Sequence, residues 1–150
     1  MALVIYPRVR WLARDPGPTT GQGPPLEAFI HHSDDKDAGT LDHFAQQAAR
    51  MRSIQNFHID GRGWSDIAYH YIVFQPYGTL RRARVFKGRA WTAVPAAQAG
   101  HNTGTLAICV IGADEVVKRT TKRTIAAVLR QHPAVRTVGG HRDVVATECP

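Results

Sequence analysis

The segment "TLAICVIG", Thr105 to Gly112, constrains the fold more than any other stretch of the chain. Its apolar residues follow one another almost without interruption and stop at a glycine, which is typical of a central strand in a sheet. A second short apolar stretch, "LEAFIHHS" at Leu26 to Ser33, predicts another buried strand centred on Phe29 and Ile30. The chain therefore has to build a sheet with a covered centre.

Two stretches show helical spacing. In "TLDHFAQQAARMRSI", Thr40 to Ile54, apolar residues recur close to i, i+3, i+4 and i+7, which predicts a helix with Thr40 as its N-cap. Residues 116–131 have mixed helical spacing and stop before Pro133, so we expect a second helix there.

A hairpin completes the pattern. "IAYHYIVF", Ile67 to Phe74, is rich in β-branched and aromatic residues, "QPYG" follows as a turn, and "TLRRARVF" continues as a second strand. The order strand, helix, hairpin, strand, helix predicts an α/β fold, a single domain whose mixed central sheet is flanked by helices.

Proline and glycine divide the chain near its start. "RDPGPTTGQGPP", Arg14 to Pro25, predicts an irregular connector. We expect residues 1–25 to form an N-terminal extension and residues 26–150 to form the main domain. A length of 150 residues fits one domain. We expect neither a membrane-spanning helix nor a signal peptide, so the chain is expected to be made in the cytoplasm.

Charge narrows the choice of partner. The net charge of +7 favours an anionic partner: nucleic acid, a membrane surface or an acidic polymer. The basic strand "RRARVFK" lacks the interleaved aromatic residues of a base-stacking surface, so we expect no nucleic-acid partner. Two cysteines are too few for a disulfide framework.

Three residues have the chemistry of a zinc site. His31 lies at the predicted carboxyl end of a buried strand, where α/β sheets place their sites, and His141 and Cys149 follow in the final loop "GHRDVVATECP". A catalytic zinc takes three protein ligands of this kind. Spacing alone leaves ordinary burial of Cys149 as the commoner explanation. Most other histidines need no such role, and we expect His43 and His132 to be surface or capping residues.

The chain resembles the zinc-dependent N-acetylmuramoyl-L-alanine amidases, which share a fold with peptidoglycan recognition proteins and phage lysozyme-like amidases. Five blocks in the family's order carry the resemblance: "FIHHS", "GRGWSDIAYHY", "GHN", "LAICVIG" and "GHRDVVATECP". They cover most of residues 28–150. Each block is weak alone, but five in order are highly specific.

The resemblance implies a role for each matching residue. His31, His141 and Cys149 match the three ligands of one zinc ion. Tyr69 matches an active-site tyrosine, and Thr147 falls where an oxyanion donor is expected. The remaining matches line the groove for the peptide stem: His58, Arg62 and Asn102.

Two departures from the family pattern bear on catalysis and specificity. Cys109 stands where some amidases have a glutamate general base, and Ala97 replaces a histidine common before "GHN" in phage members. Family members usually continue past the ligand cysteine, which is consistent with one domain of a larger lysin.

The resemblance implies zinc-dependent hydrolysis of the amide bond between N-acetylmuramic acid and L-alanine in peptidoglycan, in a substrate groove at the sheet edge. A phage-type endolysin, monomeric and not inserted in the membrane, is the expected setting, with holin-type release to the wall. The alternative is a peptidoglycan-binding module without catalysis, which the absence of the glutamate keeps open.

Overall fold

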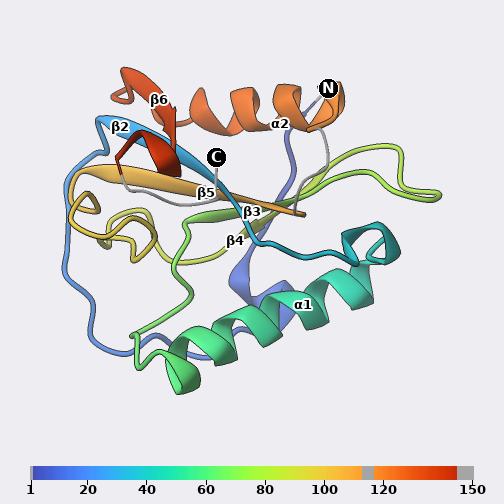
Figure 1. The fold of residues 1–150 in the computed structure, drawn as a ribbon, viewed down its shortest axis with the longest axis horizontal. Coiled ribbons are helices and arrows are strands. Elements are labelled where there is room, and N and C mark those ends of the chain that lie inside the picture. The colour runs from blue at the N-terminus through green and yellow to red at the C-terminus, as the bar shows by residue number, and fades with distance from the viewer. Residues whose placement is uncertain (1, 113–116, 145–150) are drawn as a thin grey trace.

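The computed structural model describes residues 2–112 and 117–144, which form one sheet with a helix on each face (Figure 1). The sheet has six strands in the order β1-β4-β3-β5-β2-β6. The strands are β1 (Ile5–Tyr6), β2 (Glu27–His32), β3 (Tyr71–Phe74), β4 (Arg84–Lys87), β5 (Thr105–Ile111) and β6 (Thr137–Gly140), and the α-helices are α1 (Phe44–Asn56) and α2 (Arg119–Leu129).

The two faces of the sheet carry separate apolar clusters. The face toward α1 holds Phe74, Phe86 and Cys109 together with Met51 of that helix, and the face toward α2 holds Val73, Ile108 and residues such as Val128. Every residue of β5 is buried, because β5 lies between β3 and β2 and is covered on both faces. The predicted α/β fold with a mixed sheet and flanking helices is confirmed.

The remaining strand pairings set the position of the site. β2 pairs in parallel with β5 on one side and with β6 on the other, whereas β3 and β4 pair antiparallel. The antiparallel pair is the predicted hairpin. β2 and β6 therefore end at the same edge of the sheet, and their carboxyl ends bring together residues far apart in the sequence.

Two predictions about where elements begin were wrong. Thr40 does not cap α1: its hydroxyl donates to the carbonyl of Asp37, and the helix begins after His43, whose N–H donates to Oε1 of Gln46 at 3.1 Å. The predicted capping role of His43 is thereby confirmed. The strand predicted from Ile67 begins only at Tyr71.

His132 was also misplaced by the sequence analysis. It is buried rather than at the surface, because its Nε2 lies 2.8 Å from the hydroxyl of Tyr71 beneath α2. Burial lowers its pKa.

The first residues of the chain pack on the sheet. β1 pairs in parallel with β4, and the buried Trp11 donates from its indole N–H to the carbonyl of Lys87. The boundary at residue 25 stays a prediction, but residues before it supply an edge strand and a core side chain. No helix in the described ranges is long and apolar enough to cross a membrane.

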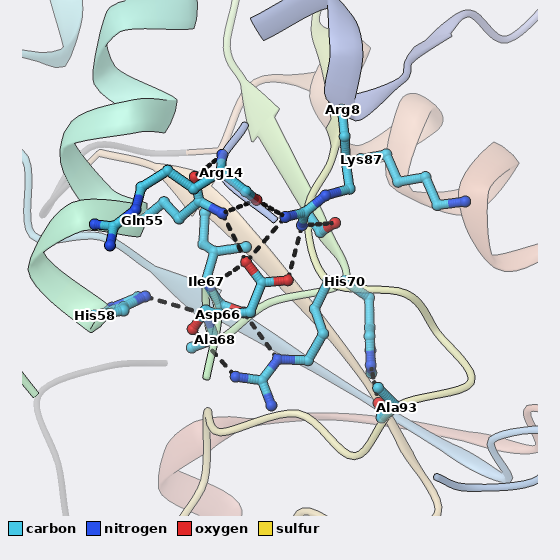
Figure 2. A network of polar contacts seen from close by, with 12 residues as sticks. Arg8, Arg14, Gln55, His58, Asp66, Ile67, Ala68, His70, Lys87 and Ala93 are labelled. Atoms are coloured by element: carbon cyan, nitrogen blue, oxygen red, sulfur yellow. Dashed lines mark hydrogen bonds and ion pairs between the residues drawn. The ribbon is translucent and has the colours of Figure 1, made fainter. Parts of the chain in front are cut away.

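A buried carboxylate fastens this N-terminal segment to the loop before β3 (Figure 2). Asp66 is 1% exposed; it pairs with the guanidinium of Arg8 at 2.8 Å and accepts from Gln55 and from the N–H of Ile67. Asp66 thus joins the N-terminal segment, α1 and the start of the hairpin.

Candidate active site

His31 and His141 face each other at the carboxyl edge of the sheet. His31 lies near the end of β2 and is 1% exposed. β6 runs beside it with Gly140 paired to Ile30, so the next residue after the strand, His141, comes level with His31. The two imidazole rings lie 4.7 Å apart between centroids at 63°. The pairing of two parallel strands thus places two imidazoles side by side.

The turn that carries His141 is closed by a carboxylate. Oδ2 of Asp143 accepts the N–H of Gly140 at 2.7 Å, within the short helical turn His141–Asp143. Asp143 had no role in the sequence analysis. Its contact holds the backbone on both sides of His141.

A buried amide orients His31. Oε1 of Gln98 lies 2.9 Å from Nε2 of His31, while the Gln98 amide nitrogen donates to Oγ1 of Thr105 at 2.8 Å and to the carbonyl of His101. Because that NH₂ group faces two acceptors, the oxygen faces His31 and Nε2 carries the ring proton. Nδ1 is then the nitrogen with the lone pair, the one able to bind a metal.

Both imidazoles are neutral near pH 7. Burial, and then the neighbouring His141, lower the pKa of His31 to about 4. Burial also lowers the pKa of His141. A metal competes with a proton for the ring nitrogen, so this environment favours metal binding at neutral pH.

Tyr69 lies next to this histidine pair. Its ring centroid is 5.4 Å from that of His31 and 6.0 Å from that of His58. The carbonyl of Tyr69 accepts the N–H of Arg89 at 2.8 Å, and a Cβ at Gly88 would collide with the same carbonyl. Close packing of the backbone therefore fixes the position of the tyrosine.

His58 packs against the ring of Tyr69 and is only 8% exposed. Its Nδ1 accepts the N–H of Ala68 at 3.1 Å, and its ring lies 4.9 Å from that of Trp64. Burial, and then the charge of Arg89, lower the pKa of His58 to about 4. The ring is therefore neutral and holds the loop that carries Tyr69.

The other two predicted groove residues occupy different settings. Arg62 is exposed, and its guanidinium lies over the rings of Phe57 and Trp64 at 5.3 and 5.8 Å. Asn102 is half-buried, and its Oδ1 accepts the N–H groups of Ala97 and Gln98. Asn102 thus shapes the loop that presents Gln98 to His31, while its role in substrate binding stays a prediction.

The residues at and around the histidine pair differ in how readily the sequence reveals them. Cys109 pairs in register with His31 on β5 and is fully buried in the cluster facing α1. Thr147 and Cys149, the predicted oxyanion donor and third ligand, lie outside the described residues. The sequence analysis missed Gln98, because a single glutamine in a loop has no distinctive spacing.

Within residues 2–112 and 117–144, no group of three or more His, Cys, Asp or Glu side chains could hold a metal ion. The described part of the chain therefore supplies two of the three predicted ligands, both imidazoles.

Comparisons with known proteins point to one family. No family model matches the chain. It is 34% identical to the pig (Sus scrofa) protein named N-acetylmuramoyl-L-alanine amidase, over 97% of this chain but only 25% of that protein. It is 30% identical to peptidoglycan-recognition protein SC1a of Drosophila melanogaster, over 97% of this chain and 79% of that protein. The chain thus spans about a quarter of the mammalian amidases that it matches.

Solved structures agree with these relatives. The Drosophila peptidoglycan recognition protein SD superposes with a TM-score of 0.85 at 26% identity, covering 99% of this chain and 89% of that one. Recognition protein LE, solved with tracheal cytotoxin, a monomeric diaminopimelic acid-type peptidoglycan, superposes with a TM-score of 0.82 over 97% and 86%. Sequence and fold therefore place the chain in the family of N-acetylmuramoyl-L-alanine amidases and peptidoglycan-recognition proteins.

Proposed function

We propose that the chain is a zinc-dependent amidase that cleaves the bond between the lactyl group of N-acetylmuramic acid and L-alanine in peptidoglycan. The observation that carries the proposal is the neutral imidazole pair His31 and His141, held side by side by β2 and β6. Relatives named N-acetylmuramoyl-L-alanine amidase support the choice of reaction.

The residues present fit a zinc ion. Two neutral imidazoles 4.7 Å apart between centroids are donors that zinc prefers. Oε1 of Gln98 accepts the Nε2–H of His31, the ring nitrogen opposite the one that would bind the metal; metal-binding histidines usually have such support. His31 and His141 would hold the ion with Cys149. When bound, zinc would polarise the scissile carbonyl and supply a nucleophile at neutral pH.

The other side chains take the remaining tasks. The phenol of Tyr69, beside His31, can donate a hydrogen bond to the oxyanion that forms at the scissile carbonyl, and Thr147 is proposed as a second donor. Arg62, exposed over two aromatic rings, can grip a carboxylate of the stem peptide with two parallel hydrogen bonds. Cys109 is a buried thiol and cannot replace a carboxylate base, so the proposal assigns no role to a glutamate at this position.

Digestion of purified peptidoglycan tests the proposal. Wild type and Cys149→Ser, each supplied with one equivalent of zinc, are incubated with peptidoglycan, and new L-alanine amino termini are counted. We expect release by wild type only, with both proteins sedimenting with peptidoglycan. Binding by wild type without any release would reject the amidase and leave a peptidoglycan-binding module.

The cellular setting forms part of the proposal. We infer a phage-type endolysin, made in the cytoplasm and acting as a monomer on the wall once the membrane is breached. The net charge of +7 suits an anionic wall. Lysis of a culture expressing the chain only when a holin is co-expressed would support this setting, and lysis without a holin would contradict it.

A further inference from the structure

A second concave site lies away from the histidine pair. It is a cleft of about 860 Å³ between the first residues of the chain, the segment leading into β4 and one face of α2. In Figure 1 the segment that leads into β1 approaches α2, and the β3–β4 hairpin extends on the same side. The lining consists of Ala2, Leu3, Val4, Tyr6, Leu80, Arg81, Arg82, Ala83, Arg84, Thr120, Arg123, Thr124, Ala126, Ala127 and Arg130.

The cleft is separate from the candidate active site. β1 forms one edge of the sheet, and β4, β3 and β5 lie between it and β2, which carries His31. Among the described residues that line the cleft, none is a predicted catalytic, metal-binding or groove residue. A ligand in the cleft would therefore leave the histidine pair accessible.

The charge of the cleft has one sign. Four exposed arginines surround it: Arg81, Arg82, Arg123 and Arg130. Among the described residues that line the cleft, none is an aspartate or glutamate. Among the ion pairs of the described residues, none involves these four side chains. The fifth, Arg84, instead donates to Oε1 of Gln47 on α1. Four unpaired guanidinium groups around one cleft create a strong local preference for anions.

The arginines come from two walls that face each other. Arg123 lies on α2 and Arg130 is the residue that caps its carboxyl end, seven residues and about 10 Å further along the helix axis, since each residue rises 1.5 Å. Arg81 and Arg82 approach from the segment before β4. An extended chain with repeated negative charges could contact both walls at once.

The apolar lining favours an aliphatic backbone over nucleobases. The small and aliphatic lining residues include Leu3, Ala126 and Ala127. Of the lining residues that the structure describes, Tyr6 alone is aromatic, and its ring already packs on Phe44 and Phe86 at centroid distances of 5.0 and 5.3 Å. Bases would find no free aromatic surface for stacking.

We propose that this cleft binds a polyol phosphate chain, a linear phosphodiester polymer of the bacterial wall. Guanidinium groups bind phosphate through paired hydrogen bonds, and the small lining residues leave room for the short carbon units between phosphates. The identification of the polymer rests on the proposed function, which places the chain at the wall. Such binding would hold the enzyme on the wall while its histidine pair acts on peptidoglycan.

Binding of a labelled oligomer tests the inference. Fluorescence anisotropy with fluorescein-labelled oligo(glycerol phosphate) is measured at about 0.15 M salt, where distant charges are screened. Arg123→Ala/Arg130→Ala removes two charges from the cleft. The matched control, Arg119→Ala/Lys122→Ala, removes two exposed charges of the same helix that do not line it. We expect affinity to fall at least about 10-fold in the first variant and less than about twofold in the control.

Two outcomes overturn the inference. Equal losses in the two variants would mean diffuse attraction to a basic surface. Tighter binding of an oligothymidylate of equal charge would make the cleft a nucleic-acid site. Oligomer binding is measured without turnover, so it can also be measured in Cys149→Ser. If Cys149→Ser binds the oligomer and wild type hydrolyses no amide bond, the proposed function is refuted and the inference about the cleft stands. Hydrolysis of a soluble muropeptide should be unchanged in Arg123→Ala/Arg130→Ala.

Discussion

Single residues at the site depend on neighbours that the sequence does not reveal. The family resemblance was enough to single out His31 and His141, and the structure brings their rings together. The sequence did not reveal that His132 is buried, because the residue that covers it, Tyr71, is distant in the sequence. A histidine's role is set by the three-dimensional contacts of its two nitrogens, which residue spacing does not encode.

Gln98 offers a test at this scale. Gln98→Ala removes the acceptor for Nε2–H of His31, so the ring can rotate or change tautomer. We expect zinc affinity to fall roughly 10–100-fold, as for the loss of a residue that supports a ligand. Competition with a chromogenic chelator measures the change.

The conservative substitution supplies the control for Gln98. Gln98→Glu retains an oxygen that can accept from Nε2, so it should recover most of the zinc affinity lost in Gln98→Ala. Affinity unchanged in Gln98→Ala, or lost equally in both variants, would show that Gln98 does not orient His31 through this hydrogen bond.

At the scale of helices and strands, the sequence revealed elements with a strong apolar pattern and missed those without one. β5 and both helices were predictable from apolar spacing. β6, "TVGG", contains two glycines and an exposed Val138, and it is an edge strand with no alternation to detect. It nevertheless places His141. Ile67 and Ala68 read as a strand, but Asp66 and the ring of His58 take their N–H groups.

The contacts of Asp66 can be tested against an exposed ion pair. Asp66→Ala leaves Arg8 without its partner and removes acceptors from Gln55 and Ile67 (Figure 2). Breaking a buried pair from one side is strongly destabilising, so we expect the free energy of unfolding to fall by about 3 kcal/mol. Urea denaturation measures it.

Asp60→Ala is the matched control, because Asp60 and its partner Arg14 are 63% and 46% exposed. Its effect should stay within about 0.5 kcal/mol. Equal losses of stability in the two variants would contradict the structural role given to Asp66.

The whole molecule combines a buried polar framework with the apolar sheet, and this predicts its response to acid. His70 is fully buried: its Nε2 donates to the carbonyl of Ala93, and its Nδ1 accepts the N–H of Ala107. Burial, chiefly, lowers the pKa of His70 to about 4, and that of His58 likewise. Both rings are neutral in the native state, and protonation would break their acceptor contacts.

Stability should therefore fall as the pH falls from 6.5 toward 4. Between these pH values the unfolded chain binds protons that the native chain does not, which favours the unfolded chain. The free energy of unfolding is therefore highest above about pH 6.5 and falls below it. By pH 5 we expect a loss on the order of 2 kcal/mol for each of the two histidines. Urea denaturation of zinc-free protein at pH 7.5 and 5 measures it. His101→Gln, at an exposed position, should leave the difference unchanged, and equal stability at both pH values would refute the prediction.

Under the proposed function, two segments far apart in the sequence together form one metal centre. Metal content after dialysis and zinc affinity should be measured for wild type, His31→Ala, His141→Ala and His32→Ala, the last removing the neighbouring imidazole of β2. We predict one zinc per chain in wild type and in His32→Ala. In His31→Ala and His141→Ala we predict zinc affinity at least about 100-fold weaker, a larger loss than the removal of a supporting residue causes. Equal zinc binding by all four proteins would contradict the account.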